Sequence, residues 1–127
     1  MTDTILQKPA TKKVLIIEDE GEMCLLLNIL LDGKDMEIDH VQTISKAEEY
    51  LLQEKPSLIL LDNRLPDGFG LDFISVLKKN HPSVKIIMIS GLDAAAQDVA
   101  LENGADVFLE KPFTKAQLFN SINTLLN

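Results

Sequence analysis

The sequence has only one cysteine among its 127 residues, and this excludes a disulfide bond within the chain. A lone cysteine is typical of a protein from a reducing compartment. Because Cys24 lies near the start of a leucine-rich segment, we assign it to packing and give it no chemical role. Internal repeats and low-complexity tracts are also missing, which favours one globular domain for a chain of this length.

Long apolar runs are absent as well. No stretch of the sequence approaches the length of a membrane span, and residues 1–6 lack the pattern of a secretory signal peptide. We therefore expect a cytoplasmic protein without a membrane partner. Basic residues are scarce, because 12 Lys and Arg face 20 Asp and Glu and leave a net charge of −8. This balance argues against nucleic acid as a partner and favours a cation where acidic side chains gather.

The residues that are present indicate an ordinary folded domain, with 46% hydrophobic and 25% charged residues. We expect a flexible tail over residues 1–11 and one domain over residues 12–127. We predict strands over residues 14–17, 36–43, 58–62, 84–89 and 107–109, and helices over residues 21–31, 45–54, 71–80, 94–103 and from 115 onwards. This alternation of strand and helix predicts a mainly parallel α/β sheet with helices on both faces.

Capping signals support three of the predicted helix starts. Ser45 with Glu48, and Thr114 with Gln117, have the spacing of a capping box, in which each residue satisfies a main-chain amide near the other. Asp93 can cap the alanine-rich helix that follows it.

Polar side chains follow the ends of four predicted strands. The first strand runs into Glu18 and Asp19, the third ends at Asp62, the fourth ends at Ser90, and the fifth is followed by Lys111. Because parallel strands place their carboxyl ends at one edge of a sheet, we expect these side chains to converge. Three carboxylates repel one another unless a cation lies among them, and hard oxygen ligands favour Mg²⁺.

Such a group of residues suits phosphoryl transfer. Mg²⁺ and Lys111 would neutralise the phosphoryl oxygens, and Ser90 would donate a hydrogen bond. We assign Asp62 as the nucleophile, because Glu18 and Asp19 are more useful as metal ligands at the loop entrance. The product would be an aspartyl phosphate.

Four segments in order along the chain resemble the receiver domain of two-component response regulators, from about residue 12 to the end. The segments are residues 14–19 (VLIIED), 60–70 (LLDNRLPDGFG), 90–91 (SG) and 111–113 (KPF). Each segment alone is weak, but their joint order at the ends of the right strands is a strong signal. The resemblance implies a doubly wound, flavodoxin-like sheet with strand order 2-1-3-4-5, and a signalling protein of the stand-alone type rather than an enzyme.

The resemblance also implies the roles of the acidic residues. Asp62 would accept a phosphoryl group from a sensor histidine kinase or a phosphotransfer protein. Asp19, Asp62 and the main-chain carbonyl of Arg64 would bind Mg²⁺, with Glu18 acting mostly through water. Glu18 stands where the family more often has aspartate, and we expect metal binding to survive this change.

Further roles follow from the same resemblance. Ser90 and Phe108 would turn inward on phosphorylation, and Lys111, joined to Pro112 by a cis peptide bond, would contact the phosphate. The face formed by the fourth helix, the fifth strand and the fifth helix would change and bind a downstream protein. Arg64 overlooks the phosphate, and we expect it to alter the lifetime of the phosphorylated state.

The first helix has more apolar residues than one buried face requires. We favour the core as the place of its leucines, among them Leu26, and of Ile29. The resemblance nevertheless places a phosphodonor's docking surface beside Cys24, Leu25 and Ile29. The sequence offers no partner for His40.

Several competing interpretations are less favoured. Lys111 could pair with Glu110 on the surface, and Ser90 could cap the next helix. A flavodoxin-like cofactor binder would need a first loop that cradles a phosphate, which the acids at residues 18–20 would repel. The nearer alternatives are an unphosphorylated scaffold and a receiver fragment of a longer regulator. No basic recognition helix is present, so we expect no direct DNA binding, and the polar last helix favours a monomer.

Overall fold

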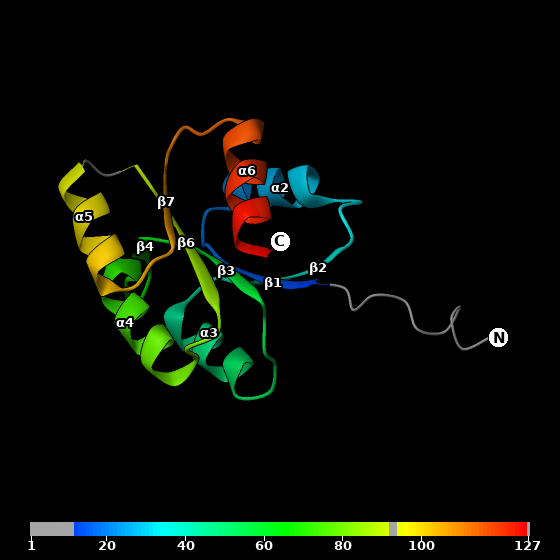
Figure 1. Ribbon diagram of the computed structural model, residues 1–127. Coiled ribbons are helices and arrows are strands. Elements are labelled where there is room, and N and C mark those ends of the chain that lie inside the picture. Colours follow the sequence, from blue (N-terminus) through cyan, green and yellow to red (C-terminus); the bar gives the residue numbers. More distant parts are fainter. Residues whose placement is uncertain (1–11, 92–93, 127) are drawn as a thin grey trace.

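The computed structural model describes residues 12–91 and 94–126. Its strands are β1 (Lys12–Ile17), β2 (Met36–Val41), β3 (Leu58–Asp62), β4 (Arg64–Leu65), β5 (Gly68–Phe69), β6 (Lys85–Ser90) and β7 (Val107–Glu110) (Figure 1). Its helices are α2 (Gly21–Leu31), α3 (Ile44–Leu51), α4 (Gly70–Asn80), α5 (Ala94–Asn103) and α6 (Lys115–Leu126). The predicted alternation of strand and helix is therefore confirmed.

Five of the strands form one parallel sheet in the order β2-β1-β3-β6-β7. Counted along the chain without the short pair β4 and β5, this is the predicted order 2-1-3-4-5. The antiparallel pair of β4 and β5 was not predicted, and it lies directly after the end of β3. All five residues of β3 are buried, so the central strand carries its last residue, Asp62, to the edge of the sheet from within the core.

Each face of the sheet has its own hydrophobic core, because successive side chains of a strand point to opposite faces. Leu15 and Ile17 pack with side chains of α3, α4 and α5, whereas Val14 and Ile16 pack with side chains of α2 and α6. Figure 1 shows this division, with α2 and α6 above the sheet and α3 and α4 below it. Helices therefore cover both faces of the sheet that carries the pocket residues at its carboxyl edge.

Helix starts were predicted with mixed success. The capping box at α6 is confirmed, because the Thr114 amide donates to Gln117 Oε1 at 2.8 Å and the Gln117 amide donates to Thr114 Oγ1 at 3.0 Å. The capping box at Ser45 is wrong, because α3 begins at Ile44 and its N-cap is Thr43. The side-chain oxygen Thr43 Oγ1 accepts the Lys46 amide at 3.0 Å. The predicted cap Asp93 lies outside the described residues.

Two predicted ends also need correction. α3 ends at Leu51 and not at residue 54, and β2 ends at Val41 and not at residue 43. The residues after Leu51 turn away because the amides of Gln53 and Glu54 both bond to the carbonyl of Tyr50. Local propensity had predicted a longer helix, but the chain must reverse there to enter β3.

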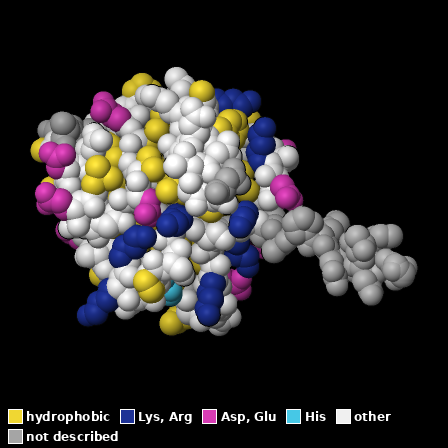
Figure 2. Space-filling model, viewed as in Figure 1, with side chains coloured by type: hydrophobic (Ala, Val, Ile, Leu, Met, Phe, Trp, Pro, Cys, Tyr) yellow, Lys and Arg dark blue, Asp and Glu magenta, His cyan; other side chains and the backbone are white. Residues whose placement is uncertain are grey.

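Charge is divided between the two edges of the sheet. Lys12, Lys13 and Lys85 begin strands, whereas Asp62 and Glu110 end them. In Figure 2, several of the Lys and Arg side chains spread across the lower half of the molecule. Lysines therefore lie at the amino ends of the strands, where Lys13 pairs with Glu37 and Glu54. Among the described helices, none is both long and apolar enough to cross a membrane.

Candidate functional site

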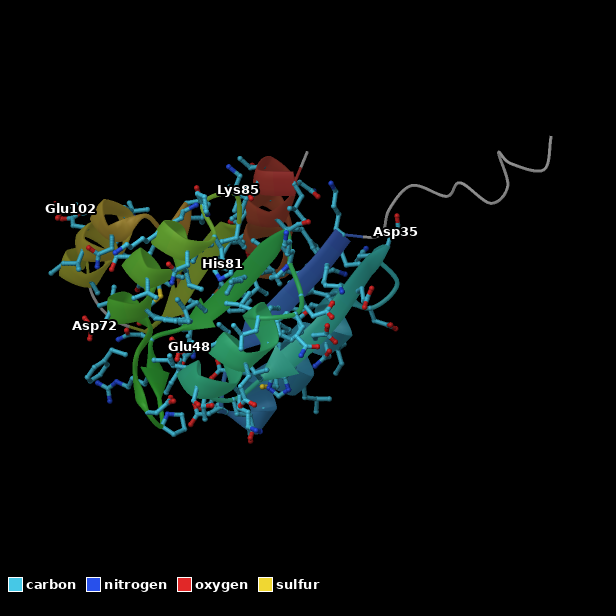
Figure 3. The ribbon with its side chains drawn as sticks, turned by 90° about the horizontal axis from the view of Figure 1, so that it is seen from below. Asp35, Glu48, Asp72, His81, Lys85 and Glu102 are labelled. Atoms are coloured by element: carbon cyan, nitrogen blue, oxygen red, sulfur yellow. The ribbon has the colours of Figure 1, made fainter. Side chains whose placement is uncertain are left out.

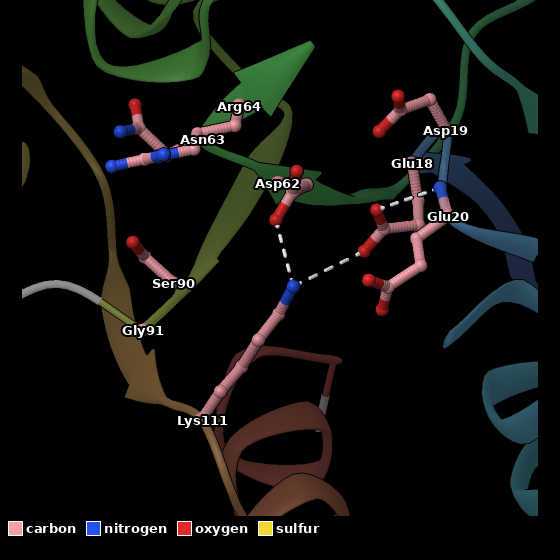
Figure 4. A pocket seen from close by; sticks show the side chains of 9 residues that line it. All are labelled: Glu18, Asp19, Glu20, Asp62, Asn63, Arg64, Ser90, Gly91 and Lys111. Atoms are coloured by element: carbon pink, nitrogen blue, oxygen red, sulfur yellow. Dashed lines mark hydrogen bonds and ion pairs between the residues drawn. The ribbon is translucent and has the colours of Figure 1, made fainter. Parts of the chain in front are cut away.

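A pocket of about 550 Å³ opens at the carboxyl edge of the sheet (Figure 4). Its walls come from the residues after β1, β3, β6 and β7, as the sequence predicted. The lining residues are Glu18, Asp19, Glu20, Asp62, Asn63, Arg64, Ser90, Gly91 and Lys111. Chain segments almost a hundred residues apart in sequence therefore meet at one place.

Three carboxylates gather in this pocket. One oxygen each of Glu18, Asp19 and Asp62 lies within 4.8 Å of the other two. Glu18 is 3% exposed and Asp62 is 7% exposed, while Asp19 faces solvent. Two of the three carboxylates thus lie largely out of water, where their mutual repulsion is strong.

Lys111 reaches into the pocket and contacts both buried carboxylates. Its Nζ donates to Asp62 Oδ1 at 2.9 Å and lies 3.5 Å from Glu18 Oε1. The Lys111 amide donates to the carbonyl of Ser90 at 2.8 Å, which fixes the base of the side chain, and the bond to Pro112 is cis as predicted. The alternative in which Lys111 pairs with Glu110 on the surface is therefore wrong.

The pKa values indicate a shortage of positive charge. Burial raises the pKa of Glu18, and the neighbouring charge of Asp62 raises it further, despite the contact with Lys111. Burial alone would lower the pKa of Lys111, but its hydrogen bond to Asp62 and the charges of both carboxylates raise that pKa instead. One ammonium group serves two buried carboxylates, so a further cation would be stabilised here.

The donor set fits a small divalent cation such as Mg²⁺. Carboxylate oxygens are hard ligands, and the group Glu18, Asp19 and Asp62 brings three of them together with one side open to solvent. Burial first, and then the charge of Asp62, raise the pKa of Glu18, and such a cation would relieve the second of these effects. An open side matters, because Mg²⁺ keeps several water ligands when protein carboxylates bind it.

Sequence reasoning missed one buried residue of the pocket, Asn63. Its side-chain oxygen accepts the Leu71 amide at 3.0 Å, and its carbonyl accepts the Gly70 amide at 2.7 Å. Asn63 therefore holds the start of α4 against the end of β3. No feature of its sequence position distinguishes this role from that of an ordinary loop asparagine, because both bonds join Asn63 to residues on the far side of the β4–β5 hairpin.

Of the remaining predicted residues, Ser90 and Arg64 line the pocket and Phe108 does not. Ser90 is buried and lines it, and the side chain of Arg64 is exposed at its rim. Phe108 is half-buried and packs against the core on the side of α3, α4 and α5, so it does not line the pocket. The structure thus brings Ser90 and Arg64 to the carboxylates, and Phe108 into the neighbouring core.

Behind Glu18 lies a contact that the sequence did not indicate. Cys24 Sγ is 2.7 Å from His40 Nε2, and both atoms lie near the Glu18 carbonyl, at 3.3 Å and 3.1 Å respectively. Burial raises the pKa of the Cys24 thiol to about 11. His40 therefore does have a partner, and Cys24 is a packing residue as assigned.

The structure corrects a part of each expectation for α2. Leu25 is 62% exposed, Ile29 is 63% exposed, and Leu26 is also exposed, so their assignment to the core is wrong. Cys24 is buried, so it is wrong as part of a docking surface. The helix turns Cys24, Leu27 and Leu31 inward, packs Met23 and Leu30 partly against the core, and leaves Leu25, Leu26 and Ile29 exposed.

The fold and the pocket together define a doubly wound α/β protein with an acidic edge, where three carboxylates lie close enough to hold a cation. Residues 14–123 match the family model described as the response regulator receiver domain. The chain therefore belongs to the response regulator receiver domain family, whose members are signalling modules rather than catalytic enzymes.

Individual relatives agree with this family. The chain is 36% identical over 118 residues to the response regulator protein PilR of Pseudomonas aeruginosa, covering 91% of this chain and 26% of that protein. The receiver domain of a putative LuxO repressor protein from Vibrio parahaemolyticus has a TM-score of 0.85 at 28% identity, covering 91% of this chain and 89% of that one. The beryllofluoride-activated NtrC4 receiver domain dimer has a TM-score of 0.84 at 31% identity, covering 89% and 94%.

The curated relatives are longer than the region they share with this chain. The chain spans 26% of PilR and 47% of KdpE of Escherichia coli, a KDP operon transcriptional regulatory protein. The likeness therefore concerns the receiver domain, and the other parts of those proteins have no counterpart in the matched region.

Proposed function

We propose that this protein is a Mg²⁺-dependent phosphoacceptor, in which Asp62 receives a phosphoryl group from a histidine kinase or a phosphotransfer protein in the cytoplasm. The observation that carries this proposal is the carboxylate of Asp62, which stands at the end of a buried strand with Lys111 at 2.9 Å. Glu18 and Asp19 beside it supply a cation site. A nucleophile, a fixed ammonium and a cation site are the parts that phosphoryl transfer requires.

In the proposed reaction, a carboxylate oxygen of Asp62 attacks the phosphorus atom of a phosphohistidine. The new P–O bond forms as the P–N bond breaks, and the electron pair leaves with the imidazole nitrogen. Lys111 exchanges part of its contact with Asp62 for a phosphoryl oxygen, and Ser90 donates a hydrogen bond to another. Bound Mg²⁺ would supply positive charge for the remaining phosphoryl oxygen.

We assign the metal ligands accordingly. Asp19, Asp62 and the main-chain carbonyl of Arg64 would bind Mg²⁺, and Glu18 would act through water. The close approach of the Glu18, Asp19 and Asp62 carboxylates supports this assignment, and the charge of Asp62 adds to burial in raising the pKa of Glu18. Asp19 would therefore act as a direct ligand, Glu18 as a ligand through water, and Asp62 as both ligand and nucleophile.

The experiment that tests the phosphoacceptor is intact-mass spectrometry after incubation with acetyl phosphate and Mg²⁺. We expect the mass of one phosphoryl group to be added to the wild type and to be absent from Asp62→Asn. Asp72→Asn is the matched control, since Asp72 is an exposed aspartate in the first turn of α4. If the wild type gains nothing, the protein is an unphosphorylated scaffold, which is the second candidate function.

The switch would act through Ser90, Phe108 and the face formed by α5, β7 and α6, where a downstream protein would bind. Phe108 is half-buried: its side chain packs against the core and is also partly exposed to solvent. An inward movement would bury the part that is exposed. Because the chain matches only part of its longer relatives, a receiver fragment of a larger regulator remains within the proposal.

Arg64 is proposed to alter the lifetime of the phosphorylated state. Its exposed side chain stands at the rim of the pocket, two residues after Asp62, where it can meet a phosphoryl group or the water that removes it. The measurement is the decay of phosphorylated protein by the same mass assay. A decay rate in Arg64→Ala equal to that of the wild type would remove this role.

The exposed side of α2 is proposed as the docking surface for the phosphodonor. Leu25 and Ile29 present apolar side chains on the helix that follows the acidic loop. Leu25→Ser and Ile29→Ser should slow phosphotransfer from a phosphohistidine donor but leave phosphorylation by acetyl phosphate unchanged, because the small donor needs no docking. Equal transfer rates from the protein donor would exclude this surface.

A further inference from the structure

A second hollow lies between α3 and α4, near the amino ends of the strands. It measures about 310 Å³, and Leu51, Phe73 and Leu77 form its buried apolar floor. Figure 3 shows the molecule from below, with Glu48 on α3 and His81 after α4, two residues that line this hollow. The strands separate it from the pocket of Asp62, which lies at their opposite ends.

Leu52 adds an exposed apolar side chain to the rim of the hollow. It lines the hollow and is 85% exposed, the highest value among the large apolar residues described. Its amide bonds to the carbonyls of Glu49 and Tyr50, so the main chain that carries the side chain is fixed. A partner that covered Leu52 and the neighbouring Val76 would remove apolar area from water, at about 25 cal/mol per Å².

The hollow continues as a groove towards β3 and β6. An adjoining cavity of about 210 Å³ shares Leu51 and His81 with this hollow and extends to Lys55 and Val84. We call the two cavities together the α3–α4 groove. It therefore runs from an apolar end at Leu52 to a basic end at Lys55.

The basic end of the groove carries charges that the fold itself does not use. Lys55 lines the groove, Lys79 precedes its residue Asn80, and Lys85 follows its residue Val84; all three lysines are exposed. Within residues 12–91 and 94–126, none of these three lysines forms an ion pair, unlike Lys13, Lys46, Lys78 and Lys111. In Figure 2, apolar side chains at the lower edge of the molecule lie between Lys and Arg side chains.

We propose that the α3–α4 groove binds a short amphipathic segment of another protein. Its apolar side chains would cover Leu52 and enter the hollow, and its Asp or Glu side chains would pair with Lys55, Lys79 and Lys85. Charge complementarity favours this partner, because Lys55 lines the groove without an ion pair among the described residues, and Lys79 and Lys85 are next in sequence to its lining residues. The one carboxylate of the lining, Glu48, belongs to the cavity of Leu52 and not to that of Lys55. A nucleic acid would gain nothing from the apolar floor.

This interaction would be separate from phosphorylation. β3 has five residues from Leu58 to Asp62, and a strand rises about 3.3 Å per residue, so roughly 17 Å lies between the groove and the acidic pocket. A partner held in the groove would leave Asp62 and the exposed side of α2 open. The proposal does not rest on the phosphoacceptor function, and it would place the protein beside a partner before and after phosphorylation.

The test uses a synthetic amphipathic peptide with leucines at positions i, i+3, i+4 and i+7 and glutamates between them. Amide chemical shifts of the full chain, measured by NMR during titration, should change at Leu51, Leu52, Val76 and His81. Binding should weaken as salt is added. The same peptide with lysine in place of glutamate should bind at least roughly tenfold more weakly.

Charge-reversed variants supply the matched control. Lys55→Glu with Lys85→Glu should weaken glutamate-peptide binding by roughly tenfold, whereas Lys34→Glu with Lys115→Glu should leave it unchanged. The latter pair has the same total charge, and both lysines lie over Phe119, which packs on the other face of the sheet. Asp62→Asn should also bind normally, which separates this proposal from the phosphoacceptor function.

Four outcomes would overturn the proposal. Shift changes outside the groove, or equal binding of the glutamate and lysine peptides, would exclude an acidic partner segment. A dimer that forms with increasing concentration and is lost in Leu52→Ser would assign the groove to a second copy of the chain. Stronger binding to phosphatidylserine vesicles than to the peptide, lost in the Lys55 and Lys85 double variant, would assign it to a membrane surface.

Discussion

Asp62 and Glu18 share the ammonium group of Lys111, with contacts of 2.9 Å and 3.5 Å. Because two buried carboxylates face one cation, charge near Asp62 is balanced only when a further cation is bound. Lys111 contacts both buried carboxylates, but its single positive charge cannot neutralise two of them. This imbalance is a property of three side chains and needs no movement of the main chain.

Gly70 allows the main chain to pass close to the carbonyl oxygen of Asp62. A Cβ atom at this position would overlap the Asp62 carbonyl oxygen and lie 3.2 Å from the Asn63 Cα. We expect Gly70→Ala to lower the free energy of unfolding by about 1–3 kcal/mol, because main-chain atoms must shift to admit the methyl group. Urea unfolding measures this, and phosphorylation of Asp62 should fall as well.

Gly21 supplies the control for this substitution. It begins α2, and an added Cβ would meet nothing within 4 Å. Gly21→Ala should therefore leave stability unchanged or raise it by up to about 1 kcal/mol, since alanine restricts the unfolded chain. Equal losses of stability in the two variants would show that the close approach at Gly70 has no special cost.

Cys24 should be chemically inert in the folded protein. Burial first, and then the charges of the nearby acids, raise the pKa of its thiol to about 11, so little thiolate exists near neutral pH. We expect no reaction with Ellman's reagent in the native state and one thiol per chain in urea. The variant Cys24→Ala with Ser75→Cys is the positive control, because Ser75 is exposed. Rapid reaction of the native wild type would contradict this prediction.

At the scale of elements, the hairpin of β4 and β5 is fastened to the start of α3 by one carboxylate. Asp67 Oδ1 accepts the Ile44 amide and Asp67 Oδ2 accepts the Ser45 amide, both at 2.9 Å. The hairpin carries Arg64, so Asp67 helps to set the position of the pocket rim. These hydrogen bonds from Ser45 and Ile44 lower the pKa of Asp67.

The lowered pKa of Asp67 predicts a dependence of stability on pH. A folded pKa below the ordinary value of 3.8 gives a contribution that is present above this value and is lost as pH falls through the folded pKa. Asp67→Asn should lose stability near neutral pH and lose this part of the acid dependence. Urea unfolding from neutral pH down to about pH 3 measures both effects.

Thr43→Ala is the matched variant, since Thr43 caps the same helix but does not touch the hairpin. It should cost about 1 kcal/mol at every pH and retain the acid dependence of the wild type. If its pH profile matched that of Asp67→Asn, the cap of α3 alone would account for the effect.

At the scale of the whole molecule, the outer side of α6 offers little for association. Ser121 Oγ donates to the Gln117 carbonyl at 2.9 Å, and Thr124 Oγ1 donates to the Asn120 carbonyl at 2.8 Å. These hydroxyl groups are satisfied within their own helix, and among the described ion pairs none involves α6. Association through this helix would gain few new contacts.

We therefore predict a monomer of 14.1 kDa in sedimentation velocity, both without ligand and with beryllofluoride and Mg²⁺. The related NtrC4 receiver domain is described as a beryllofluoride-activated dimer, so the second condition is the decisive one. A species of twice the monomer mass in beryllofluoride would contradict the prediction and assign a dimer interface to the activated state.

The sequence predicted the parallel sheet and the acidic edge because both follow from short-range patterns, whereas the strand order 2-1-3-4-5 was implied by the resemblance to receiver domains. Buried parallel strands are continuous apolar runs, and the residues that end them must lie at one edge whatever the details of packing. Asn63 and the contact between Cys24 and His40 could not be predicted, since each depends on distances between segments. The start of α3 was misplaced for a related reason: two residues near the helix start could cap it, and sequence alone did not distinguish them.

The sequence by itself determined that Asp62 ends a central buried strand among acids and a lysine, because strand periodicity and chain order are local properties. Only the tertiary structure decided that Lys111 joins Asp62 to Glu18, that Leu25 and Ile29 face solvent, and that α3 and α4 leave a groove with a basic end. Which side of an apolar helix is buried depends on the neighbours that cover it, and a neighbour's place is a property of the packed molecule.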